Sequence, residues 1–157
     1  MATSKKILVL DDEPHLLDWL DEYLQSKGYL TQFVTSIPDA INALRSGSSI
    51  IFRMIILDLN VPAPGDYAEL LKHRSQTHEV YRGLYVAEQA RNMGYRGRQV
   101  IVYSVHDVDA VRLITERIGV TYITKGRPRE FKTEIDHVLS YDPTETKIQP
   151  VAQPKRL

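Results

Sequence analysis

The stretch that decides the fold is Arg53-Met54-Ile55-Ile56-Leu57-Asp58-Leu59-Asn60. Its four consecutive apolar residues, Met54 to Leu57, are too few for a free-standing helix and lack the polar alternation of a strand with one exposed face. Such a run is typical of a strand that is covered on both faces, as in a parallel sheet. The run ends in a carboxylate, Asp58, and open parallel sheets bind their ligands outside the carboxyl ends of the strands. Asp58 is therefore a candidate site residue, or else only the residue at which the chain turns.

The composition favours one globular domain. The 157 residues include 20 basic and 20 acidic side chains, so the net charge of +0 gives no general attraction to nucleic acid or to an anionic membrane. The chain has no cysteine, which excludes disulfides, thiol nucleophiles and thiolate metal sites. No secretory signal and no apolar run of membrane-spanning length is visible, so we expect a cytoplasmic protein that does not interact with membranes.

Strand-like and helix-like segments alternate along the chain. This alternation predicts an α/β domain with a doubly wound, five-stranded parallel sheet and helices on both faces. Residues 141–157 are polar and contain prolines, and we expect a disordered tail or linker there. The predicted strands are 6–10, 30–35, 54–57, 99–103 and 120–124, and the predicted helices cover about 14–27, 37–44, 79–93, 108–118 and 131–139.

Residues 63–82 interrupt this regular pattern. Tyr67, Leu70 and Leu71 have the spacing of one apolar face of a short helix, and a second helical stretch is predicted from about residue 79, interrupted by Gly83. The segment also contains His73 and His78. Because no cysteine or third ligand lies nearby in the sequence, we interpret both histidines as surface residues rather than as a zinc site.

Four of the five predicted strands end in a polar functional group. These groups are Asp11 with Asp12, Asp58, Ser104 and Lys125. The carboxyl ends of parallel strands lie at one edge of a sheet, so these side chains can converge. Clustered carboxylates repel one another and favour a hard cation such as Mg²⁺, beside which an aspartate can accept a phosphoryl group. Taken singly, Lys125 is typical of a surface residue and Ser104 of a helix N-cap.

The motifs at these strand ends resemble those of the response regulator receiver domain of two-component phosphorelay signalling. The resemblance covers about Lys6 to Leu139 and implies a flavodoxin-like sheet of strand order 2-1-3-4-5. It divides the chain into a receiver domain of residues 1–140, with an insertion at about 63–82, and the tail 141–157. The motifs are Val9-Leu10-Asp11-Asp12-Glu13-Pro14, Leu57-Asp58-Leu59-Asn60-Val61-Pro62, Tyr103-Ser104 and Tyr122-Ile123-Thr124-Lys125.

The family's roles then apply to the matching positions. The resemblance implies that Asp11, Asp12 and Asp58 bind Mg²⁺, that Asp58 becomes phosphorylated, and that Lys125 binds the phosphoryl group. Ser104 corresponds to the hydroxyl that reports phosphorylation. Tyr122 matches the aromatic residue whose rotamer follows that hydroxyl; the alternative is an edge-strand aromatic packed on the last helix.

The resemblance also implies the protein's partners. They are a histidine kinase or a histidine phosphotransfer protein as donor, a downstream protein, and a second copy of the chain in a homodimer. Direct nucleic-acid binding is not expected, because Lys147, Lys155 and Arg156 are too sparse in the tail. Either the protein signals by binding a partner, or the tail is a linker within a longer regulator.

The sequence departs from the family pattern at several positions. Val105 stands where family members usually have a very small residue, and its side chain would narrow access to Asp58. The proline that usually follows the lysine is replaced by Gly126-Arg127-Pro128, so the cis peptide usual in the family is not expected there. The resemblance also implies that the side chains of Asn60, Val105 and His106 modulate the lifetime of the acyl phosphate. The insertion, residues 63–82, is either a partly helical flap beside the phosphorylation site or a tolerated surface excursion.

The sequence is also compatible with two alternative functions. The first alternative is a degenerate receiver that binds a partner without being phosphorylated. Val105 and the insertion favour this alternative, whereas the intact acids, Ser104 and Lys125 argue against it. A phosphatase of the haloacid dehalogenase type would need a second aspartate two residues after Asp58, where Asn60 stands. We therefore expect a signalling phosphoprotein and not an enzyme, apart from its own phosphorylation and dephosphorylation.

Overall fold

The computed structural model describes residues 5–13, 17–46, 51–105, 107–126 and 128–140. Within these residues all five strands form one sheet in the order β2-β1-β3-β4-β5, and every neighbouring pair is parallel. The predicted α/β class and strand order 2-1-3-4-5 are confirmed. The strands are β1 (Lys6–Leu10), β2 (Leu30–Val34), β3 (Met54–Asp58), β4 (Val100–Ser104) and β5 (Thr121–Thr124).

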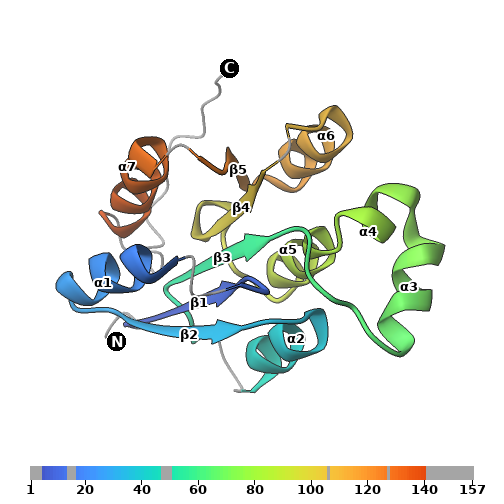
Figure 1. Cartoon of the computed structure of the whole chain (residues 1–157), viewed down its shortest axis with the longest axis horizontal. Coiled ribbons are helices and arrows are strands. Elements are labelled where there is room, and N and C mark those ends of the chain that lie inside the picture. The colour runs from blue at the N-terminus through green and yellow to red at the C-terminus, as the bar shows by residue number, and fades with distance from the viewer. Residues whose placement is uncertain (1–4, 14–16, 47–50, 106, 127, 141–157) are drawn as a thin grey trace.

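The helices lie in two layers that cover the sheet. Figure 1 shows α1 and α7 on one face and α2, α5 and α6 on the other, while α3 and α4 lie beyond the arrowheads of the strands. The proposed tail, residues 141–157, lies outside the described residues. The helices are α1 (Asp18–Ser26), α2 (Ile37–Arg45), α3 (Asp66–Arg74), α4 (Gln76–Val80), α5 (Gly83–Asn92), α6 (Asp109–Ile118) and α7 (Pro128–Leu139), with a 3-10 turn, η2, at Gly97–Gln99.

The central strand β3 explains why the opening stretch of sequence has its apolar run. All five of its residues are buried, and alternate side chains enter different cores. Ile55 and Leu57 pack with α2 and α5, whereas Met54 and Ile56 pack with α1 and α7. Truncating any of these four side chains to alanine would cost about 2–5 kcal/mol of stability.

The insertion is more regular than the sequence indicates. The second helical stretch begins at Gln76 rather than near residue 79, because the Ser75 hydroxyl accepts the His78 N–H and caps α4. The predicted interruption lies directly before Gly83, since α4 ends at Val80 and Gly83 is the first residue of α5. A Cβ at Gly83 would overlap the carbonyl oxygen of Asp58, so α5 approaches β3 more closely than any larger residue permits.

Two further sequence-based expectations concern membrane-spanning segments and a cis peptide bond after Lys125. In the part of the chain that the structure describes, no helix is long and apolar enough to cross a membrane. No described peptide bond is cis, and Gly126, which follows Lys125, adopts a positive φ of 91°.

Candidate functional site

Three carboxylates meet at the carboxyl edge of the sheet. Asp58 is the last residue of β3, and Asp11 and Asp12 directly follow β1, its hydrogen-bonded neighbour. Ligand atoms of the three side chains all lie within 4.8 Å of one another. Asp11 and Asp58 are buried, whereas Asp12 is exposed. We call Asp11, Asp12, Asp58 and Lys125 the acidic site.

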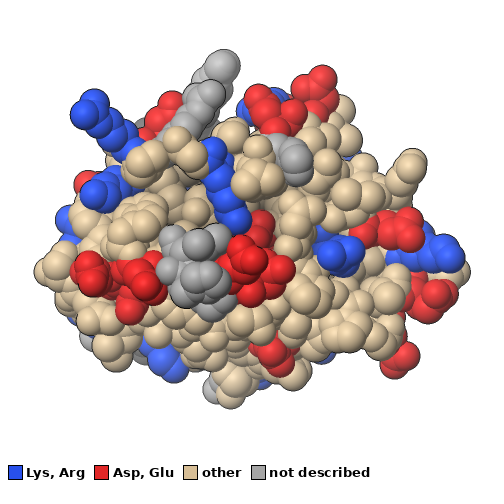
Figure 2. Space-filling model, viewed as in Figure 1, with Lys and Arg blue, Asp and Glu red and all other residues tan. Residues whose placement is uncertain are grey.

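Lys125 is the cation at this site. Its Nζ lies 3.2 Å from Asp58 Oδ2 and 3.5 Å from Asp11 Oδ2. The lysine is held by its own backbone N–H, which donates to the Ser104 carbonyl oxygen at 2.7 Å, and its Nζ lies 4.8 Å from the centre of the Tyr103 ring. The sequence places Tyr103 in the motif Tyr103-Ser104 but indicates no contact between its ring and Lys125, since an aromatic residue in a buried strand has no signal of its own. Figure 2 shows acidic side chains gathered beside a basic side chain, near the centre of the face of the molecule that is in view.

One ammonium does not balance the acids. Burial raises the pKa of Asp58, and the charge of Asp11 adds to this, although Lys125 and the Asn60 N–H act in the opposite direction. The ion pair with Lys125 would by itself lower this pKa, so burial and repulsion outweigh it. Burial and the same two carboxylates raise the pKa of Tyr103 to about 12, so its phenol stays neutral. This donor set of clustered carboxylates fits a hard divalent cation held by Asp11, Asp12 and Asp58.

Backbone hydrogen bonds orient the two buried carboxylates. Asp11 Oδ1 accepts the Glu13 N–H at 2.8 Å, and Asp58 Oδ1 accepts the Asn60 N–H at 3.3 Å. The Asn60 side chain points away from this bond and donates to the Val80 carbonyl oxygen at 3.3 Å. Asn60 therefore connects the acidic site with the end of α4.

The predicted switch residues lie on neighbouring strands. Ser104 is the last residue of β4 and is fully buried. The N-cap of α6 is Val108, so the alternative prediction that Ser104 caps this helix is wrong. The Tyr122 hydroxyl accepts the Val108 N–H at 3.3 Å. The Tyr122 ring packs against the core cluster that includes residues of α6. The alternative prediction, that this ring packs on the last helix, α7, is therefore wrong. Val105 is 58% exposed, and His106 lies outside the described residues.

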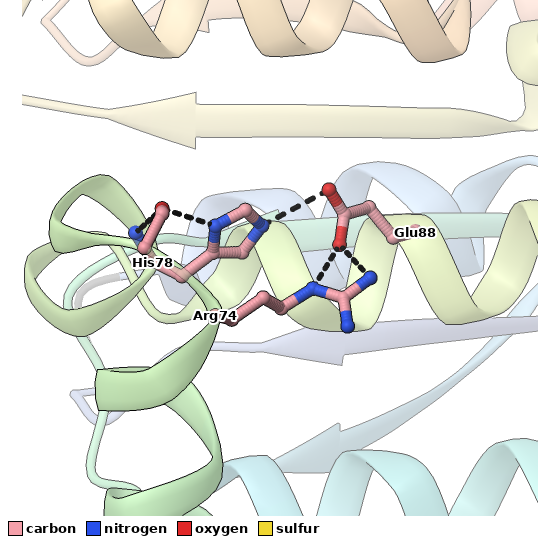
Figure 3. A network of polar contacts seen from close by, with 4 residues as sticks. Arg74, His78 and Glu88 are labelled. Atoms are coloured by element: carbon pink, nitrogen blue, oxygen red, sulfur yellow. Dashed lines mark hydrogen bonds and ion pairs between the residues drawn. The ribbon is translucent and has the colours of Figure 1, made fainter.

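A second polar cluster attaches the insertion to α5. Glu88 Oε1 accepts both Nε and Nη2 of Arg74 at 2.9 Å, and Glu88 Oε2 lies 3.0 Å from His78 Nε2 (Figure 3). His73 is exposed as predicted, but His78 is 5% exposed, so its interpretation as a surface residue is wrong. We call Arg74, His78 and Glu88 the docking network.

Ser75 extends the docking network to a chain of contacts from a serine through a histidine to an acid, as found in hydrolases. Ser75 Oγ lies 2.7 Å from His78 Nδ1. However, the same hydroxyl already accepts the His78 N–H at 3.0 Å as the cap of α4, and the imidazole is buried against Glu88. These contacts make Ser75 part of the helix start rather than a nucleophile.

Comparison with known proteins identifies the fold. No protein-family model and no curated protein matches the sequence. Solved structures do match. A two-component response regulator from Clostridium difficile has 17% identity and a TM-score of 0.64, over 87% of this chain and 97% of that one. This chain has the receiver-domain fold.

Two further receiver structures extend this similarity. The non-phosphorylated HemR receiver domain from Leptospira biflexa has 19% identity and a TM-score of 0.64, over 98% of this chain and 100% of that one. The response regulator TrrA from Thermotoga maritima, solved in complex with Mg²⁺ and BeF, has 23% identity and a TM-score of 0.60, over 85% of this chain and 98% of that one. In this chain the receiver fold carries an acidic cluster at the edge where β1 and β3 end.

Proposed function

We propose that this chain is a response regulator receiver domain that accepts a phosphoryl group on Asp58 with Mg²⁺ and then changes its affinity for a protein partner. The observation that supports this most strongly is the acidic site itself. A buried strand-end carboxylate lies within 4.8 Å of two others and 3.2 Å from a lysine, at the ligand-binding edge of a receiver fold.

The reaction follows from the groups present. An Asp58 carboxylate oxygen forms a bond to phosphorus while the bond from phosphorus to the donor's imidazole nitrogen, or to the acyl oxygen of acetyl phosphate, breaks with its electron pair leaving on the donor. Lys125 neutralises charge on the phosphoryl oxygens. A Mg²⁺ ion held by Asp11, Asp12 and Asp58 would offset the repulsion between the carboxylates and the anionic donor.

Phosphorylation would be read out on the α6 side of the molecule. Ser104 lies at the end of β4, beside β3, and Tyr122 contacts the first residues of α6 from the neighbouring strand β5. Movement of the Ser104 hydroxyl toward the phosphoryl group would allow the Tyr122 ring to turn inward and release its bond to Val108. Such a population shift alters affinity without any catalysed turnover of a second substrate.

The partners follow from this chemistry. Receiver domains in general interact with histidine kinases and with downstream proteins, so we assign a histidine kinase or histidine phosphotransfer protein as donor and a protein as target, with a homodimer as one form of output. The protein would act in the cytoplasm, where these donors present their phosphohistidine.

Labelling with a small phosphodonor tests the proposal. The purified chain is incubated with acetyl phosphate with and without Mg²⁺, and the incorporated phosphate is measured by intact mass. We expect stoichiometric labelling that is lost on chelation of Mg²⁺ and in Asp58→Asn. Persistent labelling of Asp58→Asn would refute the assignment of the acceptor, and no labelling of the wild-type chain would favour a receiver that binds its partner without phosphate.

A further inference from the structure

The insertion ends beside the phosphoacceptor, and two sets of contacts hold its second half. In the first set, the docking network joins α3 and α4 to α5 through Glu88. In the second set, residues 80–83 join the segment that directly follows Asp58. The structure therefore connects Glu88, which lies outside the acidic site, with the carboxylate of Asp58.

The attachment to α5 combines charge with apolar contact. Leu71 is fully buried in the core, and the Tyr67 ring packs edge-to-face on Tyr85 of α5 at 6.1 Å between centroids. The guanidinium of Arg74 lies 5.3 Å from the same Tyr85 ring while it binds Glu88. Leu70 is 39% exposed, so the predicted apolar face of α3 is narrower than its spacing indicates.

Three hydrogen bonds join the C-terminal end of the insertion and the adjoining Gly83 to residues 59–61. Gly83 N–H donates to the Leu59 carbonyl oxygen at 3.0 Å, and Asn60 Nδ2 donates to the Val80 carbonyl oxygen at 3.3 Å. Arg82 Nε donates to the Val61 carbonyl oxygen at 2.6 Å. The Arg82 guanidinium also donates to the Glu79 carbonyl oxygen at 3.3 Å, so it bridges α4 and the strand-end segment.

We infer that Glu88 and Arg82 are positioning residues for phosphorylation: together they hold the insertion so that residues 59–61 fix the Asp58 carboxylate. The final link is the Asn60 N–H, which donates to Asp58 Oδ1 while the Asn60 side chain is held by Val80. This inference rests on the proposed function. In this inference the insertion is neither a flap that limits access to Asp58 nor a tolerated surface excursion, but a segment that positions Asp58 through the backbone of residues 59–61.

The main experiment compares two Glu→Gln variants in the full chain. Glu88→Gln removes the charge that joins the docking network. Glu69→Gln is the matched control, because Glu69 lies in α3 of the same insertion but is 72% exposed and pairs only peripherally, at 3.9 Å, with His73. Amide hydrogen exchange over residues 66–80 reports docking, and labelling of Asp58 by acetyl phosphate with Mg²⁺ reports positioning.

Glu88→Gln is expected to speed exchange in α3 and α4 and to lower the maximal labelling rate about three- to tenfold, without changing the half-saturating acetyl phosphate concentration. Glu69→Gln should leave both measurements at wild-type values. Labelling rates are measured well below the melting temperature, so a loss of stability alone would not change them, and exchange in α3 and α4 is compared with exchange in β3 to separate local opening from a general loss of stability. Faster exchange in Glu88→Gln with an unchanged labelling rate would overturn the inference.

Variants of Arg82 test the same inference at the contacts with residues 59–61. If Glu88→Gln leaves exchange unchanged, the labelling rate of Arg82→Gln is measured instead. A slower rate that Arg82→Lys restores in part supports the inference, and an unchanged rate overturns it. In the double variant of Glu88 and Arg82, the two rate effects should not add, because both act through one insertion. A wild-type chain that takes no label overturns the proposed function and this inference together, whereas a labelled wild type with unaffected variants overturns only the inference.

Discussion

The acidic site and the docking network both contain a buried carboxylate beside cations, yet their charge balance differs. At the acidic site, burial and Asp11 raise the pKa of Asp58 despite Lys125. In the docking network, burial would raise the pKa of Glu88, but the hydrogen bond and charge of His78 and the charge of Arg74 outweigh it and lower that pKa. The first cluster has more acid than its own cations can balance, whereas the second is satisfied within the chain.

This contrast distinguishes a site suited to an added cation from a cluster that stabilises the fold. Surplus carboxylates at a strand edge favour an added cation, and they cost stability until one is bound. A carboxylate that receives bonds from an arginine and a histidine stabilises the packing of two segments that are distant in sequence. The same residue types thus have different uses, and the balance of charge decides which.

The largest expected effect is on stability, and it has opposite signs at the two carboxylates. Removing the charge in Glu88→Gln should lower the free energy of unfolding by about 2 kcal/mol, because Arg74 and buried His78 lose their partner. Removing it in Asp58→Asn should raise the stability of the metal-free chain by about 1 kcal/mol, because repulsion from Asp11 disappears. Urea unfolding in the presence of a chelator measures both values. Changes of the same sign would contradict the contrast.

Divalent ions should act on one region only. Millimolar Mg²⁺ should stabilise the wild-type chain by about 1–2 kcal/mol, since binding to the folded state alone shifts the unfolding equilibrium. Thermal melts with and without Mg²⁺ should show this shift in Glu88→Gln as well, and a much smaller one in Asp58→Asn. An equal shift in Asp58→Asn would place the ion elsewhere.

The pH dependence sharpens the contrast further. Because the folded-state pKa of Glu88 is lowered, its contribution to stability is fully present above its ordinary pKa of 4.5 and is lost as the pH falls through the folded-state value. The difference in unfolding free energy between the wild-type chain and Glu88→Gln should therefore shrink as the pH falls below about 4.5. Urea titrations across this range measure it; a difference that grows in acid would contradict the assigned pairing.

The smallest expected effect concerns the readout of phosphorylation. Ser104→Ala should still accept phosphate but lose most of the coupling between Asp58 and Tyr122, a free energy of about 1 kcal/mol. NMR shifts of Tyr122 and of the first residues of α6 report this coupling before and after labelling. Equal shifts in the wild-type chain and in Ser104→Ala would remove Ser104 from the switch.

The sequence predicts the sheet and the acidic site because both depend on local patterns. The run from Met54 to Leu57 is typical of a strand buried on both faces, and Asp11, Asp58 and Lys125 lie at the ends of strands that share one edge of a parallel sheet. Their convergence requires no knowledge of side-chain packing. The expected order of the strands came from the family resemblance rather than from these patterns.

The docking network could not be predicted from local sequence patterns. His78 lies in the polar stretch Ser75-Gln76-Thr77-His78, which has no signal of burial, and its partner Glu88 belongs to another helix. The start of α4 at Gln76 depends on the cap by Ser75, and Tyr103 acquires its role only because β4 and β5 place it beneath Lys125. Contacts of this kind are tertiary, so periodicity does not predict them.

The most direct test of the central claim is to find which side chain carries the phosphoryl group. The chain is labelled with acetyl phosphate and Mg²⁺, the acyl phosphate is reduced with borohydride, and the peptides are analysed by mass spectrometry, which detects a phosphorylated aspartate as homoserine. The account predicts homoserine at position 58 alone, dependent on both the donor and Mg²⁺. Homoserine at Asp11 or Asp12 instead, or labelling that does not require a divalent ion, would contradict it.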